Sequence, residues 1–161
     1  MGTQQRVSEA CNIQFYQTLK SKARIKVHQG GTRSGKTYAI CQYLVYKLTT
    51  EKDPLVISIV RKTLPALKGS VQRDLIGIMQ RLGVYYLGVH NKAENTFKYN
   101  GHTIEFLSVD EPQKIRGRKR DICFINEANE LHYEDYRQLN MRTTQEIIID
   151  FNPTAPTAHI H

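Results

Sequence analysis

The sequence predicts an α/β fold in which a mostly parallel central sheet is flanked by helices, and three observations support this. Short apolar segments rich in β-branched residues alternate with helical patterns along the 161 residues. A glycine-rich loop directly follows the first such segment and opens a helix. A pair of alternating segments near residues 96–106 interrupts this order as an inserted β-hairpin. Strands that alternate with helices are typical of a parallel sheet.

Four segments are expected to form the parallel strands, because each is apolar or alternating and is bounded by turn residues. The first alternates polar with apolar side chains, and the second is an unbroken apolar run typical of a strand buried on both faces. The last is stopped by Asn152-Pro153, since proline cannot donate a ladder hydrogen bond. The four segments are residues 24–29, 55–60, 122–125 and 146–151.

Helices are expected where apolar residues recur every three or four positions. The pattern after the glycine-rich loop has this spacing, as does a second one that ends at Gly83, a residue suited to terminate a helix. Asn100-Gly101, between the expected helices 71–82 and 133–141, joins two alternating segments and predicts a hairpin with a type I′ turn. The expected helices are residues 8–19, 38–48, 71–82 and 133–141.

Composition narrows the functional classes. Residues 1–161 fit one domain, and 40% hydrophobic residues suffice for one core. No apolar run approaches about 18 residues and no signal peptide is evident, so we expect a cytoplasmic protein without membrane contact.

Three widely spaced cysteines argue against a disulfide framework or a cysteine-rich zinc site. The net charge of +8 favours a polyanion such as nucleic acid, although a solvated basic surface explains it equally well.

The glycine-rich loop fits the phosphate-binding pattern G-x-x-x-x-G-K-[ST] at every fixed position. In such loops the backbone N–H groups surround nucleotide phosphates, and the helix that follows points its positive end at the anion. Lys36 is expected to reach the β- and γ-phosphates, and the Thr37 hydroxyl to ligate Mg²⁺. The nucleotide-binding residues predicted from this loop are Gly30, Gly31, Thr32, Arg33, Ser34, Gly35, Lys36 and Thr37.

Polar residues elsewhere supply the second half of the predicted site. Asn126 and Glu127 end an apolar strand, where a metal-side residue and a carboxylate that polarises the attacking water are expected. Asn126 stands where Asp is usual and adds no charge, so the catalytic weight falls on Glu127. Arg33 could stabilise the γ-phosphate in the transition state, or form a structural ion pair. Asn152 could sense the γ-phosphate, or serve only as a turn residue.

Taken together, five ordered segments resemble the large terminase subunit of tailed phages and prophages, the ATPase motor that packages DNA into capsids. The resemblance runs from about residue 25 to the C-terminus. The phosphate-binding loop alone is shared by many families, whereas the ordered set is much more specific. The segments are residues 30–37, 60–63, 114–117, 125–131 and 150–153.

The resemblance implies a P-loop NTPase fold of the additional-strand, RecA-like class that binds ATP and Mg²⁺ and hydrolyses ATP. In matching positions, Lys36 and Arg33 would act on the γ-phosphate and Glu127 would be the catalytic base. Thr37, together with Asn126 through a water, would hold Mg²⁺. A glutamine that recognises adenine is also implied, and Gln14, Gln17 and Gln29 all remain candidates.

The resemblance further implies a role in packaging viral double-stranded DNA into the procapsid, in the host cell cytoplasm. Asn152 would belong to the segment that couples hydrolysis to DNA movement. The implied partners are double-stranded DNA, the small terminase subunit, the capsid portal and further copies of the chain in a ring. Arg116, Arg118 and Arg120 are candidates for an arginine that acts across subunits or for DNA contact, and a solvated loop fits them equally well.

One departure from the family pattern is large. Complete terminases continue into a nuclease domain, for which residues 1–161 offer no segment. The strand order usual in this class is 5-1-4-3-2, and strand 5 would lie beyond the last residue. We therefore expect a truncated ATPase domain whose sheet is incomplete beside the loop strand.

Two other functions fit parts of the sequence. A P-loop kinase for a small metabolite needs a mobile lid with arginines, which residues 116–120 could provide. A truncated, non-catalytic module that binds ATP and DNA would keep the fold without turnover.

Overall fold

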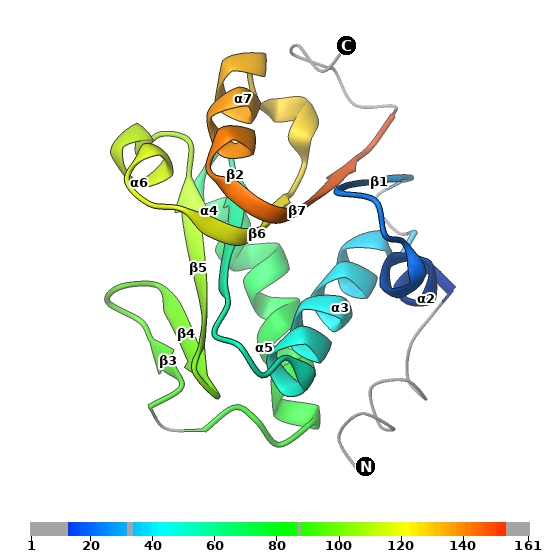
Figure 1. Ribbon diagram of the computed structural model, residues 1–161, viewed down its shortest axis with the longest axis vertical. Coiled ribbons are helices and arrows are strands. Elements are labelled where there is room, and N and C mark those ends of the chain that lie inside the picture. Colours follow the sequence, from blue (N-terminus) through cyan, green and yellow to red (C-terminus); the bar gives the residue numbers. More distant parts are fainter. Residues whose placement is uncertain (1–12, 32–33, 87, 154–161) are drawn as a thin grey trace.

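The structure, a computed structural model, describes residues 13–31, 34–86 and 88–153. In these residues a seven-stranded sheet has the order β1-β7-β6-β2-β5-β4-β3 (Figure 1). The strands are β1 (Ile25–Gln29), β2 (Val56–Arg61), β3 (His90–Asn91), β4 (Thr96–Tyr99), β5 (His102–Ser108), β6 (Arg120–Ile125) and β7 (Thr143–Phe151). The helices are α2 (Ile13–Lys20), α3 (Lys36–Thr50), α4 (Leu64–Leu67), α5 (Arg73–Arg81), α6 (Pro112–Arg116) and α7 (Tyr133–Met141), with a π-helical turn, η1 (Lys68–Gln72), and a 3-10 turn, η2 (Ala128–Glu130).

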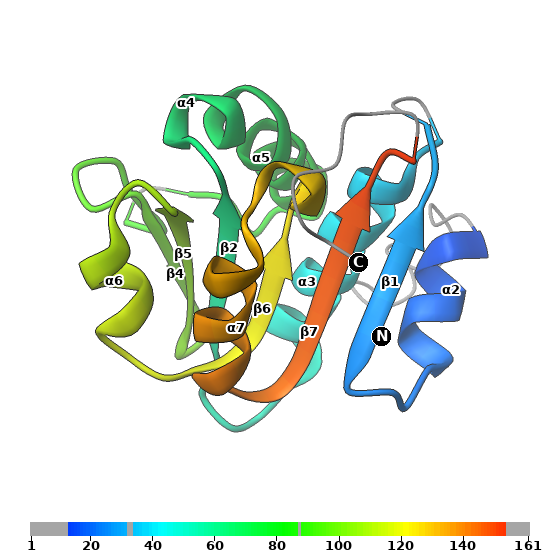
Figure 2. The same cartoon turned by 90° about the horizontal axis from the view of Figure 1, so that it is seen from above.

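The sheet is covered on both faces. Figure 2 shows α6 and α7 on one face and α3 on the other. The larger apolar core joins α2, α3 and α5 to alternate residues of the strands, among them Ile59, Phe124 and Ile148. The intervening residues, such as Val60 and Ile147, face the smaller core under α6 and α7. Burial on both faces explains why the central strands are continuous apolar runs.

The strand order confirms the predicted topology. β1, β7, β6, β2 and β5 pair in parallel, so the four predicted strands occupy the expected order 1-4-3-2. The hairpin is also present, with Asn100 (φ 55°) and Gly101 (φ 85°) both left-handed, as a type I′ turn requires. Its second strand, β5, pairs antiparallel with β4 and parallel with β2, and it therefore widens the parallel sheet.

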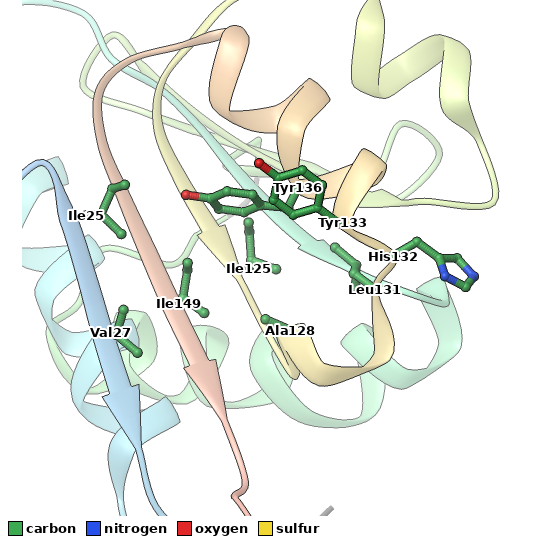
Figure 3. A pocket seen from close by; sticks show the side chains of 9 residues that line it. All are labelled: Ile25, Val27, Ile125, Ala128, Leu131, His132, Tyr133, Tyr136 and Ile149. Carbon is green, nitrogen blue, oxygen red and sulfur yellow. The ribbon is translucent and has the colours of Figure 1, made fainter. Parts of the chain in front are cut away.

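The sheet is not closed beside β1. Among the described residues, β1 has a ladder partner on one side only, β7. Ile25 and Val27 on this edge strand are 41% and 58% exposed. With Ile149 of β7 and residues around α7, they line an apolar cavity of about 250 Å³ (Figure 3). This open edge agrees with the expected incomplete sheet.

The expected burial of two cysteines is confirmed within the described ranges. Cys41 and Cys123 are buried free thiols, and Cys11 lies outside the described residues. None of the described helices has the length and apolarity needed to cross a bilayer.

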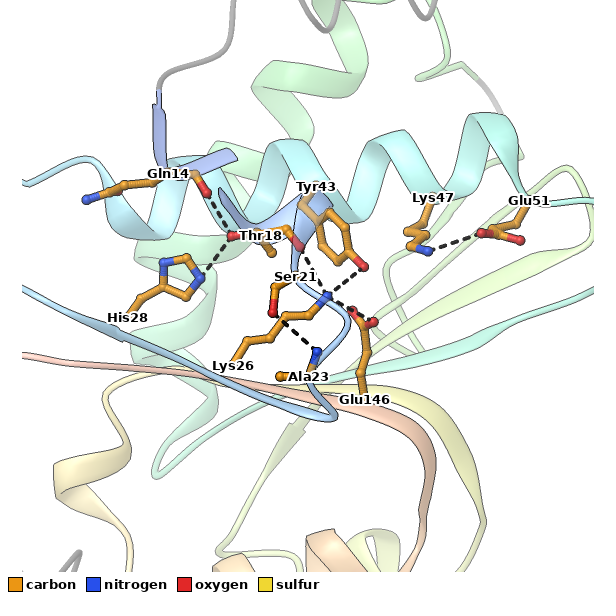
Figure 4. Close-up of polar contacts among 10 residues, drawn as sticks. All are labelled: Gln14, Thr18, Ser21, Ala23, Lys26, His28, Tyr43, Lys47, Glu51 and Glu146. Atoms are coloured by element: carbon orange, nitrogen blue, oxygen red, sulfur yellow. Dashed lines mark hydrogen bonds and ion pairs between the residues drawn. The ribbon is translucent and has the colours of Figure 1, made fainter. Parts of the chain in front are cut away.

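A buried lysine fastens β1 to α2, α3 and β7. Lys26 is 7% exposed, and its Nζ donates to the Thr18 carbonyl (3.1 Å), the Tyr43 hydroxyl (3.4 Å) and Glu146 Oε2 (3.3 Å) (Figure 4). An ammonium group removed from water must be paired and hydrogen-bonded to be tolerated. The same face carries His28, whose ring is bonded to the Thr18 hydroxyl at 2.9 Å.

We expect Glu146→Gln to lower the free energy of unfolding by about 3 kcal/mol, because it leaves the buried Lys26 ammonium without its counter-charge. Urea unfolding measures this. The matched control is Glu111→Gln, which removes the partner of the exposed Lys114 and should change stability little. Equal small effects of both substitutions would contradict a stabilising role for the buried pair.

Helix α3 begins at a glycine with a left-handed backbone. Gly35 has φ 80° and ψ 5°, a conformation that a side chain disfavours. We expect Gly35→Ala to cost about 1–2 kcal/mol of stability, measured by the same unfolding method. Gly31→Ala is the control, because a Cβ there meets no atom of the described residues within 4 Å. The assignment is wrong if the two variants are equally stable.

Candidate nucleotide site at the carboxyl edge of the sheet

The predicted site residues lie at one edge of the sheet because their strands are parallel neighbours. The glycine-rich loop follows β1, and Asn126 and Glu127 follow β6. β7 lies between these strands, with Phe151 in register with Gln29 on one side and Ile149 with Ile125 on the other. The carboxyl ends of β1, β7 and β6 thus converge, which is where open α/β sheets bind ligands.

Two backbone hydrogen bonds fix the described part of the loop. The Gly30 N–H donates to the Phe151 carbonyl (3.3 Å), which ties the loop to β7, and the Ser34 N–H donates to the Gly31 carbonyl (3.1 Å). A Cβ at Gly30 would lie 2.8 Å from Ser34 Oγ, so this close turn requires glycine. Thr32 and Arg33 lie outside the described residues, and the roles predicted for them stay predictions.

Lys36 and Thr37 form the first turn of α3, whose 15 residues direct their dipole toward the loop. Lys36 is 3% exposed, and its Nζ donates to the Gly31 carbonyl at 3.3 Å, inside the loop. The Thr37 hydroxyl donates to Asp150 Oδ2 at 2.9 Å. The cation, the helix N-terminus and the backbone N–H groups together suit a phosphate group.

Asp150, near the end of β7, is the centre of the hydrogen-bond network. It is fully buried and accepts bonds from three segments of the chain. Besides Thr37, the donors are Asn126 Nδ2, 3.0 Å from both carboxylate oxygens, and the Glu127 N–H, at 2.7 Å. Burial raises the pKa of Asp150, whereas the hydrogen bonds from Glu127, Thr37 and Asn126 oppose that rise. These hydrogen bonds and the Lys36 charge oppose the effect of burial only in part, so the net shift of the Asp150 pKa is upward.

Asn126 is 2% exposed and directs its amide nitrogen at Asp150. Its Oδ1 is buried and has no hydrogen-bond partner in the described part of the chain. An orphaned buried oxygen of this kind suits a ligand or its bound water. Asn126 and Thr37 are joined through Asp150, to which both side chains donate. Both carry an oxygen, the ligand atom that Mg²⁺ prefers, so these residue types fit the predicted metal.

Glu127 has a left-handed backbone, with φ 52° and ψ 56°, which is uncommon for a residue with a side chain. Its N–H bond to Asp150 holds this conformation. Burial and the Asp150 charge raise the pKa of Glu127, whereas Lys36 and Arg61 lower it, and the net shift is upward. A half-buried carboxylate with perturbed titration in such a place is a candidate general base.

Sequence reasoning missed Asp150 and Arg61 as site residues. Arg61 ends β2, and its Nε donates to Glu130 Oε1 at 2.9 Å, beside Glu127. Asp150 was assigned only to a strand and to a family segment. A carboxylate between Ile149 and Phe151 in an apolar strand was the signal that could have found it, since burial without partners is costly.

Asn152 and the three candidate glutamines also lie within the described residues. Asn152 follows β7 directly and is half-buried, so the condition for its predicted role, that β7 lies beside β1, is met. Gln14 and Gln17 lie on α2, and Gln29 is the last residue of β1.

Residues 116–120, called the basic loop here, contain three arginines, and two of them have structural contacts. Arg120 is 1% exposed, and it donates to Ser58 Oγ (2.8 Å) and the Ile115 carbonyl (3.0 Å). Burial removes Arg120 from the candidates for DNA contact or for action across subunits. Arg118 pairs with Glu105 at 3.2 Å, whereas Arg116 is exposed.

Solved structures of phage large terminases have folds similar to this one. The structure resembles the large terminase from a thermophilic bacteriophage (TM-score 0.72, 17% identity, 94% of this chain and 38% of that chain). It also resembles the same thermophilic phage protein in complex with ATP-gamma-S (0.68, 19%, 94% and 37%). A third match is the ATPase domain of the large terminase of Thermus phage P74-26 (0.60, 15%, 86% and 64%).

At these identities the structural matches show the fold, and this chain spans about 38% of the first of these terminases. No curated protein sequence matches the chain significantly. The model of the family described as phage terminase large subunit matches residues 22–160, which is most of the sequence. The chain therefore belongs to the phage terminase large subunit family.

Proposed function

We propose that this chain is the ATP-binding and ATP-hydrolysing motor domain of a terminase large subunit. The observation that carries the proposal is the convergence of Lys36, Thr37, Asn126 and Glu127 on one edge of a parallel sheet. The thermophilic bacteriophage terminase, which has the same fold, has been solved with ATP-gamma-S, and this supports ATP as the nucleotide.

The geometry suggests a role for each residue. Lys36 and the loop N–H groups bind the phosphates, and the α3 dipole favours their charge. Thr37 and Asn126 Oδ1 would hold Mg²⁺, which when bound neutralises charge on the transferred phosphoryl group. Glu127 orients a water for attack and accepts its proton. Arg33, one residue before Ser34 in the loop, would stabilise the γ-phosphate in the transition state.

Hydrolysis fits the structure better than transfer to a metabolite. A kinase lid must move, but Arg118 is paired with Glu105, and Arg120 is buried and bonded to Ser58. These contacts fasten the basic loop to the sheet. The other alternative, a module that binds ATP without turnover, is distinguished by the hydrolysis assay below.

Family membership supports double-stranded DNA as the substrate that is moved. The net charge of +8 suits contact with a phosphate backbone, which is read without regard to sequence. Asn152 directly follows β7, the strand beside β1, and in this proposal it would couple hydrolysis to DNA movement. A homo-oligomeric ring, the small terminase subunit and the capsid portal complete the proposed assembly in the host cytoplasm.

We expect Glu127→Gln in the intact protein to bind ATP normally but to hydrolyse it about 10²–10⁴-fold more slowly, because the general base is lost. Phosphate release with and without duplex DNA measures turnover, and a fluorescent ATP analogue measures binding. Glu134→Gln is the matched control, since Glu134 is exposed on α7 and, in the described ranges, its side chain bonds to Arg137 and Gln138 of the same helix.

Lys36→Ala is the second arm of the same experiment and should lose ATP binding itself. Unchanged turnover in Glu127→Gln would remove Glu127 from the mechanism. Binding without turnover by the unmodified protein, in the presence of DNA, would support the non-catalytic module instead.

A further inference from the structure

The residue at the end of β6 that is expected to help hold Mg²⁺ carries no negative charge. The residue that ends β6, where a carboxylate is usual in hydrolases of this class, is Asn126, whose amide is neutral. Carboxylates bind Mg²⁺ or its waters strongly because they add negative charge to an oxygen ligand. A site that holds Mg²⁺ beside nucleotide phosphates would therefore need this charge from another residue.

The buried carboxylate of Asp150 lies one strand away, on β7. Because Ile149 is in register with Ile125, the residues that follow them, Asp150 and Asn126, are adjacent at the carboxyl edge. Asn126 Nδ2 lies 3.0 Å from each Asp150 oxygen, so the two side chains meet face to face. The charge is thus displaced from the usual position by about one strand spacing, roughly 4.8 Å.

Asp150 also reaches the phosphate-binding loop. Its Oδ2 accepts from the Thr37 hydroxyl at 2.9 Å, the hydroxyl expected on the metal. The Asn126 amide, by donating to the carboxylate, turns its own Oδ1 away, and this oxygen is the buried atom without a partner in the described ranges. One carboxylate and one amide, held together by hydrogen bonds, therefore offer a charge that is bonded to Thr37 and, on the adjacent side chain, an oxygen without a described partner.

The full burial of Asp150 favours a functional role for its carboxylate over a purely structural one. An ionised group in the interior costs free energy unless it is paired, and no cation is bonded to Asp150 in the described structure. A purely structural link between Thr37, Asn126 and Glu127 would not require a carboxylate, since a neutral amide oxygen also accepts hydrogen bonds.

We propose that Asp150 supplies the negative charge on the Mg²⁺ side of the nucleotide site, in place of a carboxylate at Asn126. The inference rests on the proposed function, because it assumes that the loop binds a nucleotide with its metal. It predicts that most of the metal affinity is kept when the charge is moved back to β6.

The test uses three variants of the intact protein and Mn²⁺ in place of Mg²⁺. Asp150→Asn removes the charge with nearly unchanged shape, and the exchange variant Asn126→Asp/Asp150→Asn returns one carboxylate and one amide to the same pair. Asp110→Asn, in an exposed loop, is the matched control. Electron paramagnetic resonance counts bound Mn²⁺ in the presence of ADP, a fluorescent nucleotide reports binding without metal, and thermal unfolding reports folding.

We expect Asp150→Asn to weaken Mn²⁺ binding about 10–100-fold, the range found when residues around a metal are changed, with metal-free nucleotide binding retained. The exchange variant should recover most of this loss, and the control should match the unmodified protein. Unchanged Mn²⁺ affinity in Asp150→Asn would overturn the proposal. So would an exchange variant that binds Mn²⁺ no better than the single variant, because the loss would then reflect the shape of β7.

If Asp150→Asn fails to fold, the exchange variant decides the question alone by the same titration. Near-normal Mn²⁺ affinity then supports the proposal, and a lost affinity overturns it. Failure of the proposed function has a different signature: the unmodified protein would then bind no nucleotide, with or without metal.

Discussion

The hydrogen bonds of one buried carboxylate join the segments from which the site is built. Asp150 accepts from the first turn of α3, from the side chain that ends β6 and from the backbone N–H of Glu127. Because unpaired polar groups are costly in the interior, the three positions are set together. The left-handed backbone of Glu127 persists because this network holds it.

The parallel sheet makes such a network possible. β7 lies between β1 and β6, so a residue at its carboxyl end can reach the loop on one side and Asn126 on the other. The same order leaves β1 at an edge, where Ile25 and Val27 are exposed beside an apolar cavity. The buried Lys26, bonded to α2, α3 and β7, fastens that edge strand from the opposite face. The site thus lies next to the edge of the sheet at which β1 has no second ladder partner among the described residues.

Local signals predicted most of the fold, whereas the site depended on contacts that the sequence does not reveal. The hairpin turn at Asn100-Gly101 and the apolar strands are encoded by neighbouring residues, and each was found at the expected place. The partners of Asp150 lie 24 and 113 residues away, so only the strand order brings them together. Arg120 looked like part of a basic surface, because its partner Ser58 is 62 residues distant and its burial could not be seen. The π-helical turn before α5 carried no local signal that we recognised.

The most direct test of this account is a crystal structure of the intact protein with ADP and Mn²⁺, in which anomalous scattering locates the metal. The account predicts the nucleotide phosphates in the loop that ends at Thr37, and the Mn²⁺ peak between Thr37 and the pair formed by Asn126 and Asp150. A metal peak elsewhere on the molecule, or a nucleotide bound away from this edge of the sheet, would contradict it.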